Sequence, residues 1–328
     1  MPNNALSVDI LIVGAGMAGL SAAAHLHNKG YGVLVVEKSR GVGGRLASRR
    51  VGQATFDHGA QFMTVRDPRF ASVVAQWQQI GVVQEWFASA LSGNKAHIRW
   101  CGYPSMSAVA KNLANGVAVS LEQRVLSLQK RDKGWLVSMS SGEILNAAAL
   151  ILTPPVPQTL DLFDASSIAL PEETMMRLNS LTYDRCIAVL ALLASPSAIP
   201  SPGGIVPSQK SISWIADNQQ KGISKVPAVT IHADASFSDE HWDLDRRESG
   251  TNLLNAAQPW LHSEVIEFQV HGWRYAKPIN IDEDACFVIG RSPPCILAGD
   301  AFAGPRVEGA VCSGWAAAEA LEKLIQNH

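Results

Sequence analysis

Three glycines near the N-terminus have the spacing that binding of a diphosphate requires. Gly14, Gly16 and Gly19 form a G-x-G-x-x-G motif directly after the apolar run Asp9–Val13. Glycine at these positions permits a tight turn, lets a pyrophosphate approach the backbone and lets a helix pack closely against a strand. The positive end of that helix then faces the phosphates. The motif predicts dinucleotide binding, with a glycine-rich packing turn in an unrelated α/β fold as the alternative.

The elements expected around this motif form a strand–helix–strand unit. Asp9–Val13 has the unbroken apolar pattern of a buried strand, and a helix over residues 20–26 follows and ends at Gly30. A second buried strand, Val33–Val36, runs directly into Glu37. An acid at the end of the second strand is placed to bind ribose hydroxyls. It favours an unphosphorylated adenosine ribose, and therefore FAD or NAD over NADP.

Two further segments decide between these cofactors. One follows Glu37 and holds Gly43, Gly44 and Arg45, which suit a second loop that faces phosphates. The other lies near the C-terminus, where an apolar run ends at Asp300 and a helix is expected over about 310–325. Together these segments resemble the flavoenzymes of the glutathione-reductase-like superfamily. The resemblance implies FAD, with Asp300 bound to its ribityl chain and the last helix aimed at the flavin.

Four more blocks resemble the renalases, a family of the flavin amine-oxidase clan, and especially its bacterial members. They follow the family's order along nearly the whole chain: Asp57–Phe62, Thr64–Phe70, Ile151–Gln158 and His271–Ala276. The segment from about residue 199 to residue 267 matches least, and substrate details can diverge there.

The renalase resemblance implies a flavin oxidase acting on abnormal dihydronicotinamide dinucleotides, the 2-dihydro and 6-dihydro isomers of NAD(P)H. Hydride passes to flavin N5 with release of NAD(P)+, and O2 reoxidises the flavin to give H2O2. A dihydropyridine becomes aromatic when it loses hydride, so positioning suffices and no catalytic side chain is predicted. No cysteine lies in a convincing context for covalent attachment, so we expect FAD to be bound noncovalently.

The same resemblance assigns residues to the cofactor. The glycine motif cradles the pyrophosphate, Glu37 and Lys38 bind the adenosine end, and Arg45 reaches the phosphates. Ala60 and Gln61 lie near the isoalloxazine ring, with a surface turn as the alternative for Gln61. The full set is Gly14, Ala15, Gly16, Gly19, Glu37, Lys38, Arg45, Ala60, Gln61, Val125, Asp300, Val307 and Gly309. Val125 is expected to offer backbone groups to the adenine, with an edge-strand residue that binds nothing as the alternative.

His271, Trp273 and Arg274 are the candidates for substrate binding. His271 and Trp273 fall on the same side of an extended segment, where a ring pair can bracket a nicotinamide. Arg274 points to the opposite face if the strand is regular, and can bind a carboxamide, a phosphate or a neighbouring acid. A structural tryptophan and a hydrogen-bonded core histidine are the alternative. Tyr183 and Arg185 are further pocket candidates.

Other chemistry-bearing residues are interpreted as structural. His58 next to Asp57 invites a catalytic role, but hydrogen bonds that shape the loop are the preferred interpretation. His25 and His27 belong to the first helix as surface or packing residues, and Cys312 to the core of the last helix. No Ser/His/Asp arrangement and no metal cluster is apparent.

The fold expected from these elements is α/β. A Rossmann-like FAD-binding domain of glutathione-reductase-like, p-hydroxybenzoate-hydroxylase-type architecture would comprise residues 1–70, 105–160 and 277–328. A mixed-sheet substrate domain would comprise residues 71–104 and 161–276. We also expect a helix over 67–80, strands within 82–103 that a turn at Ser92–Asn94 separates, one alternating strand over 118–128, a loop over 194–204 and a solvated charged stretch over 239–250.

Composition excludes several classes of protein. The 328 residues include 27 Lys and Arg against 29 Asp and Glu, so the basic footprint of a nucleic-acid-binding protein is missing. Five scattered cysteines without a C-x-x-C pair argue against a disulfide framework or a zinc site and favour a reducing compartment. The N-terminus lacks a secretory pattern, and residues 10–26 are too short and glycine-broken for a membrane span. We therefore expect a cytoplasmic enzyme without an obligatory protein partner.

Three other functions stay open from the sequence. The first is an amine oxidase of the same clan, although no paired aromatic residues are apparent near Asp300. The second is another FAD dehydrogenase or a desaturase. The third is a protein without catalysis, such as a cofactor-free relative like the prenyl-protein escort proteins, which the intact glycine loops argue against.

Overall fold

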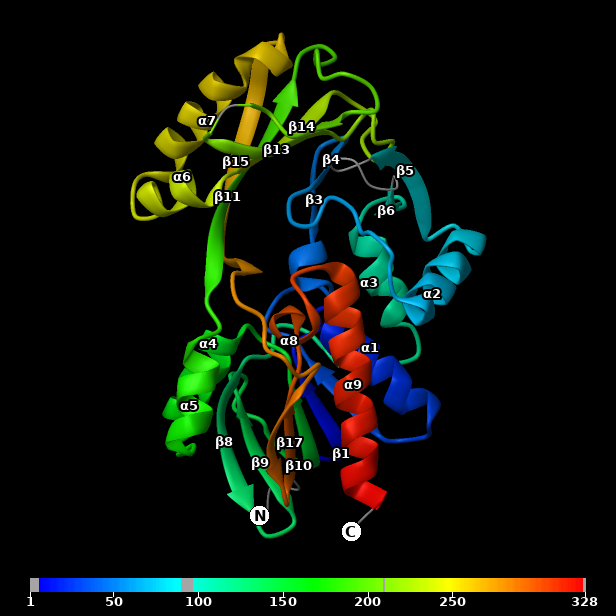
Figure 1. The fold of residues 1–328 in the computed structure, drawn as a ribbon, viewed down its shortest axis with the longest axis vertical. Helices are drawn as coiled ribbons and strands as arrows, with labels where there is room; N and C mark the ends of the chain where they lie inside the picture. Colours follow the sequence, from blue (N-terminus) through cyan, green and yellow to red (C-terminus); the bar gives the residue numbers. More distant parts are fainter. Residues whose placement is uncertain (1–5, 90–96, 209, 327–328) are drawn as a thin grey trace. The chain divides into compact units, whose positions relative to one another are not determined.

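The computed structural model describes residues 6–89, 97–208 and 210–326, and the chain divides into two units (Figure 1). The first unit is Met1–Gly44, Ala110–Thr182 and Pro278–His328, and the second is Arg45–Val109 and Tyr183–Lys277. Residues 45–70, 105–109, 161–182 and 277 thus fall in the opposite units from those the sequence led us to expect. For the first of these stretches the reason is that Phe56 packs on Leu190 of the second unit.

An eight-stranded sheet forms the first unit, in the order β16-β17-β10-β1-β2-β7, with β9 paired to β10 and β8 to β9. The strands are β1 (Leu6–Val13), β2 (Val33–Val36), β7 (Ala118–Ser120), β8 (Val125–Arg131), β9 (Gly134–Met139), β10 (Ile144–Leu152), β16 (Phe287–Arg291) and β17 (Pro294–Leu297). β1 and β2 are parallel, with Val13 opposite Val36, and α1 (Met17–Asn28) connects them. The strand–helix–strand unit predicted from the glycine motif is confirmed.

Two helices from opposite ends of the chain pack side by side in this unit, α1 and α9 (Val307–Gln326) (Figure 1). A Cβ atom at Gly314 would lie 2.2 Å from the carbonyl oxygen of Ala18, so only glycine permits this close approach. The unit also contains α4 (Val156–Ala165), α5 (Glu172–Asn179) and the short α8 (Asp300–Ala303). The helix pair brings the N-terminal and C-terminal motifs into one unit.

The single strand expected over 118–128 is wrong. β7 pairs with β2, whereas β8 begins at Val125 and pairs with β9. Between them Glu122 has a left-handed φ of 57°, and its N–H donates to the carbonyl oxygen of Ser39. The polar run over residues 122–124 interrupts the apolar alternation at this turn, and it marks the break between the two strands.

The second unit contains a five-stranded sheet in the order β12-β13-β14-β11-β15. Its strands are β11 (Tyr183–Leu193), β12 (Gly204–Ile205), β13 (Ile212–Asp217), β14 (Ala228–Ala233) and β15 (Val265–Pro278). Helices α6 (Ala235–Glu240) and α7 (Arg246–Leu261) cover one face, where Val189 and Ala191 join the core (Figure 1). On the other face Leu190 packs against Phe56 of a hairpin. That hairpin is β3 (Ser48–Val51) and β4 (Ala54–Asp57).

Two expectations for this unit are confirmed and one is wrong in part. The helix α2 (Pro68–Gln79) is capped by Asp67, which accepts from the N–H of Phe70 at 2.9 Å. The strands β5 (Val83–Ser89) and β6 (His97–Gly102) pair as a hairpin, and the turn expected at Ser92–Asn94 lies outside the described residues. The stretch 239–250 is not simply solvated, because Trp242 is buried and α7 begins within it. Helix α3 (Ser107–Leu113) follows β6.

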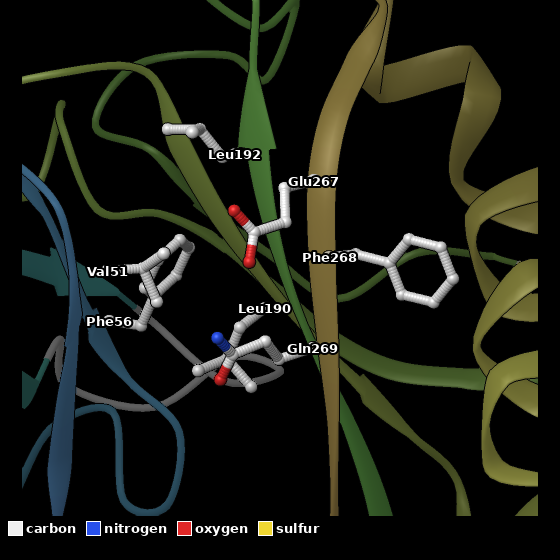
Figure 2. Close-up of a pocket in the computed structure, with 7 residues that line it drawn as sticks. All are labelled: Val51, Phe56, Leu190, Leu192, Glu267, Phe268 and Gln269. Atoms are coloured by element: carbon white, nitrogen blue, oxygen red, sulfur yellow. The ribbon is translucent and has the colours of Figure 1, made fainter.

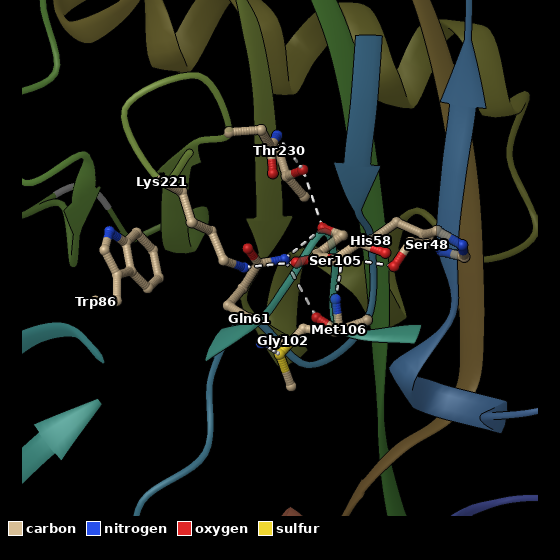
Figure 3. A network of polar contacts seen from close by, with 12 residues as sticks. Ser48, His58, Gln61, Trp86, Gly102, Ser105, Met106, Lys221 and Thr230 are labelled. Atoms are coloured by element: carbon tan, nitrogen blue, oxygen red, sulfur yellow. Dashed lines mark hydrogen bonds and ion pairs between the residues drawn. The ribbon is translucent and has the colours of Figure 1, made fainter. Parts of the chain in front are cut away.

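A buried ion pair joins the hairpin to the rest of the unit (Figure 3). Lys221 Nζ lies 2.7 Å from Asp57 Oδ2, and both side chains are 0% exposed. The other oxygen, Oδ1, accepts from Ser48 Oγ at 2.6 Å and from the N–H of Met106 at 3.0 Å. The hydroxyl of Thr230 donates to the Asp57 carbonyl oxygen at 3.0 Å. Both carboxylate oxygens of Asp57 are therefore held by structural contacts within this unit.

We predict that Lys221→Met lowers the free energy of unfolding by about 3–5 kcal/mol, because it leaves a buried carboxylate unpaired. Adding Asp57→Asn removes that charge and should recover part of the loss. Urea unfolding followed by tryptophan fluorescence measures both. The matched control is Asp239→Asn, which breaks the exposed pair with Arg185 at 3.6 Å and should change stability by less than about 1 kcal/mol. If Lys221→Met and Asp239→Asn lowered the free energy of unfolding equally, the buried pair would contribute no more than the exposed one, which contradicts the argument.

Candidate functional site

The first glycine loop is closed on one side and open on the other. Gly14 has a φ of 102°, and a Cβ atom there would lie 2.6 Å from Thr153 Oγ1. A Cβ atom at Gly19 would lie 2.0 Å from the carbonyl oxygen of Gly14, so α1 starts directly against the loop. At Gly16, the N-cap of α1, no atom lies within 4 Å of a Cβ position. Open space therefore meets the positive end of a helix, which is where a diphosphate binds.

The carboxylate of Glu37 joins the two glycine-rich loops. Its Oε2 accepts from the N–H of Ala15 at 2.9 Å, and its Oε1 accepts from the N–H of Ser39 at 2.8 Å. The N–H of Gly43 donates to the Ala15 carbonyl oxygen at 2.8 Å, which ties the second loop to the first. Glu37 is buried. Its oxygens keep lone pairs for a further donor such as a ribose hydroxyl.

Lys38 follows β2, and Val125 begins β8 of the same sheet. Lys38 Nζ donates to Gln158 Oε1 at 3.1 Å. Burial lowers the pKa of Lys38, and the positive charge of Arg124 lowers it further. Val125 is the buried first residue of β8 and lies opposite Met139 of β9.

The C-terminal motif is a tightly folded segment between β17 and α9. The N–H of Gly299 donates to Ser313 Oγ at 2.9 Å, which fixes the end of the strand to α9. A Cβ atom at Gly309 would lie 2.1 Å from the carbonyl oxygen of Gly304. Asp300 is buried as the first residue of α8, and Val307 is buried as the first residue of α9. The segment thus holds a carboxylate close in sequence to the start of a long helix.

In the second unit, Arg45 is tied to the loop that follows Asp57. The Arg45 carbonyl oxygen accepts from the N–H of Ala60 at 2.8 Å, and a Cβ atom at Gly59 would lie 1.9 Å from it. The guanidinium of Arg45 donates to the Ala276 carbonyl oxygen at 3.2 Å. Gln61 is buried, so it is not a surface turn residue, and its Nε2 donates to the Asp57 carbonyl oxygen at 2.5 Å. Its Oε1 is buried and accepts no hydrogen bond from the described residues.

The structure brings His271 and Trp273 together with His58. The His58 and Trp273 rings are stacked, with centroids 5.2 Å apart and planes at 14°. The His271 ring contacts both edge-on, at 4.3 Å from Trp273 and 4.8 Å from His58. Trp273 Nε1 donates to the His58 carbonyl oxygen at 2.8 Å. We call these three residues the ring cluster; the sequence alone did not predict that His58 belongs to it.

Arg274 lies apart from the ring cluster. It alternates to the other face of β15, where its Cζ lies 5.7 Å from the Trp242 ring, and it is exposed. Arg185 lies near the same ring, at 5.1 Å, and pairs with Asp239. Tyr183 contacts Tyr275 edge-on with centroids 5.6 Å apart. None of these three residues has a described ring contact with His58, His271 or Trp273.

The histidines of this region are neutral at physiological pH. Burial, with the positive fields of His271, Arg49 and His232, lowers the pKa of His58 to about 3. Burial, with Arg49 and Arg246, lowers the pKa of His271 to about 4. Burial also lowers the pKa of His232 to about 4, and its Nε2 lies 3.2 Å from the His58 carbonyl oxygen. The ring cluster is therefore an uncharged aromatic surface.

A shallow recess of about 150 Å³ lies between the β3–β4 hairpin and the sheet (Figure 2). Val51, Phe56, Leu190 and Leu192 give it an apolar lining, with Glu267 and Gln269 at its edge; Phe268 points away, to the other side of β15. Its size and lining suit no nucleotide. Within the described residues, no cluster of His, Cys, Asp and Glu could hold a metal ion, and every helix is too short or too polar to span a bilayer.

Comparison with known families accounts for this arrangement. The profile of the NAD(P)-binding Rossmann-like domain matches residues 12–77, and that of the flavin-containing amine oxidoreductases matches residues 82–321. The chain belongs to the flavin-containing amine oxidoreductases. Its cofactor is therefore FAD, and the expected α/β fold with a Rossmann-like domain is confirmed. The open side of Gly16, at the N-terminus of α1, fits a bound dinucleotide, since it leaves room for a diphosphate.

Individual relatives support the same family. Mouse (Mus musculus) renalase is 24% identical over 343 residues, which cover 96% of this chain and 99% of that protein, and this confirms the resemblance found in the motifs. A 4,4'-diapophytoene desaturase of Staphylococcus haemolyticus is 45% identical over 60 residues, which cover 18% of this chain and 12% of that protein. The structure of putrescine oxidase with bound putrescine superposes with a TM-score of 0.74 at 15% identity, covering 97% of this chain and 99% of that one. That likeness shows the fold alone.

We predict that Gly16→Ala weakens FAD binding at least about tenfold while leaving the melting temperature of the apoprotein unchanged. The added methyl group would meet no protein atom but would fill the space that a diphosphate needs. Fluorescence titration of FAD into apoprotein measures the affinity. Gly290→Ala on β16 lies outside both glycine-rich loops, with only the carbonyl oxygen of Pro293 at 3.3 Å from the Cβ position, and it should leave the FAD affinity unchanged. If Gly16→Ala bound FAD as tightly as the wild type, the diphosphate would not lie against Gly16.

We also predict that the protein loses stability as the pH falls from about 6.5 towards 3. In this window the unfolded chain protonates His58 whereas the native protein does not, because burial lowers its native pKa to about 3. His58→Phe keeps a ring against Trp273 but removes the titrating group. Urea unfolding between pH 7 and pH 4 measures how the free energy of unfolding changes with pH. For His58→Phe this slope should be smaller than for the wild type by up to about 1.4 kcal/mol per pH unit. An unchanged slope would show that His58 titrates normally in the folded protein.

Proposed function

We propose that this flavin amine oxidoreductase oxidises the 2-dihydro and 6-dihydro isomers of NAD(P)H to NAD(P)+. In the overall reaction, the dihydronicotinamide and a proton combine with O2 to give NAD(P)+ and H2O2. Two electrons leave the substrate as a hydride, so the reaction needs no base to remove a proton from carbon. When bound, FAD supplies the hydride acceptor, N5, and delivers the electrons to O2.

The ring cluster is the observation that carries this proposal. Trp273 offers a flat, uncharged ring face of the kind that binds a dihydropyridine ring, His271 stands edge-on beside it, and His58 supports Trp273 by stacking. Because His58 and His271 have pKa values near 3 and 4, neither carries a positive charge that would repel the nicotinamide cation formed as product. The similarity to renalase over nearly the whole chain supports the same substrate class.

We propose that FAD is held noncovalently by the residues that the motifs assign to it. The first loop and the N-terminus of α1 would bind the diphosphate, Glu37 and Lys38 the adenosine, and Asp300 with the start of α9 the flavin end. A covalent link to cysteine needs an accessible thiolate. Burial raises the pKa of Cys186 and Cys295 to about 12 and that of Cys286 to about 11, so these thiols are poor nucleophiles.

Substrate binding by His271 and Trp273 is part of this proposal, whereas Arg274 has a different role. Arg274 lies on the face of β15 that carries Trp242, so it would act on the substrate only from outside the ring cluster. In this proposal His271 and Trp273 bind the nicotinamide, whereas the charged side chain of Arg274 packs on Trp242.

Amine oxidation is the second candidate function. The family profile favours it. An amine loses its proton before or during oxidation, so this reaction benefits from a group that accepts protons near neutral pH. The neutral, weakly basic histidines of the ring cluster do not supply one.

The deciding experiment is anaerobic reduction of the yellow holoenzyme by borohydride-reduced NAD+, which contains the 2-, 4- and 6-dihydro isomers. Bleaching of the flavin absorbance by this mixture, but not by pure 4-dihydro NADH, is the expected result. An amine panel that includes putrescine is the parallel test. Bleaching by an amine and not by the mixture would replace the proposal by the amine-oxidase alternative.

A further inference from the structure

An arginine in the second unit is buried among aromatic rings without a hydrogen-bonding partner. Arg99 on β6 is 7% exposed, and its Cζ lies 4.4 Å from the ring centroid of Phe62, 4.9 Å from Phe87 and 5.0 Å from Trp214. We call these three rings the aromatic box. The described residues give the guanidinium no ion pair and no hydrogen bond.

Aromatic rings satisfy only part of what a guanidinium requires. Their faces attract the positive charge, but the five N–H donors lie in the guanidinium plane and need acceptors. Burial without acceptors is unfavourable, and burial accordingly lowers the pKa of Arg99. The box therefore holds a charge that an anion would stabilise.

A second donor in the box has no acceptor either. Trp214 Nε1 is buried and makes no hydrogen bond to the described residues. The neighbouring Trp86 differs, because its Nε1 donates to the Pro202 carbonyl oxygen at 2.8 Å. Gly204 makes room for both indoles, since a Cβ atom there would lie 2.9 Å from each ring. Neither the Arg99 guanidinium nor Trp214 Nε1 has an acceptor among the described residues, and two donors of this kind are the complement of an oxyanion.

The aromatic box lies on the same face of the sheet as the ring cluster. Trp214 on β13 is directly opposite His232 on β14, and His232 contacts the main chain of His58. Phe62 belongs to the segment that starts at His58. Trp214 on β13 and Trp273 on β15 are three strand spacings apart, about 14 Å across the sheet. A ligand that reaches from one to the other must extend beyond a nicotinamide and its ribose.

We propose that the guanidinium of Arg99 binds a phosphate group of the dinucleotide substrate, so that the aromatic box is a phosphate subsite. The proposal rests on the proposed function, since it takes the nicotinamide ring to lie at the ring cluster. The planar fork of arginine matches two phosphate oxygens, and the surrounding rings hold that fork in one orientation.

The test compares two substrates that share the reacting ring. Borohydride-reduced NAD+ carries phosphates, and borohydride-reduced nicotinamide riboside does not. In anaerobic stopped-flow reduction of the holoenzyme, Arg99→Met should raise the half-saturating concentration of the dinucleotide about 10- to 100-fold without changing the limiting rate. The riboside should react with the variant as with the wild type. The matched control is Arg247→Met, which removes an exposed arginine 5.1 Å from the Phe268 ring. It should change the half-saturating concentration of neither substrate.

Other outcomes overturn one proposal or the other. An equal loss with both substrates, or no loss with either, would make Arg99 structural. Arg99→Lys keeps the charge without the fork, so an intermediate effect is expected, and it replaces Arg99→Met if that variant does not fold. If neither substrate reduces the wild type, the proposed function fails. Calorimetric titration of pyrophosphate into holoenzyme then decides the subsite: binding that Arg99→Lys weakens supports it, and no binding by the wild type overturns it.

Discussion

The second unit depends on one buried carboxylate. Asp57 ends β4 and receives Lys221, Ser48 and the N–H of Met106, while its carbonyl oxygen accepts from Thr230. These partners come from separate segments of the unit, and each would leave an unsatisfied group if Asp57 were moved. The network fixes the point at which residues 58–61 leave the hairpin. The orientation of His58, and with it the ring cluster, follows from that fixed point.

The first unit uses a carboxylate in a comparable way. Glu37 comes directly after β2, much as Asp57 is the last residue of β4. Its carboxylate accepts hydrogen bonds from the main-chain N–H groups of Ala15 and Ser39, which belong to separate segments. A carboxylate suits this task because it accepts several hydrogen bonds and has no donor of its own to satisfy. The two glycine-rich loops are thereby positioned before any ligand binds. Preorganisation of this kind reduces the ordering cost of binding a dinucleotide.

Local patterns in the sequence predicted much of this, and long-range contacts explain the rest. The glycine spacing predicted α1 between β1 and β2, and Asp67 with Pro68 predicted the start of α2. Alternation along β15 predicted that His271 and Trp273 share a face. Nothing in the sequence around Lys221, a polar run followed by glycine, distinguishes a buried ion pair from a surface turn. Arg99 likewise sits in an ordinary alternating strand, because the rings that enclose it come from distant segments.

The pKa of a histidine illustrates why chemistry is harder to predict than fold. His58 next to Asp57 suggests an acid–base pair, but the carboxylate is already committed to Lys221, Ser48 and Met106. His58 instead meets other basic groups, His271 and Arg49, and burial with their fields keeps its imidazole neutral. A site lined by neutral rings favours a reaction in which no proton is removed from carbon. Hydride loss from a dihydropyridine has that property, because the driving force, recovery of aromaticity, belongs to the substrate.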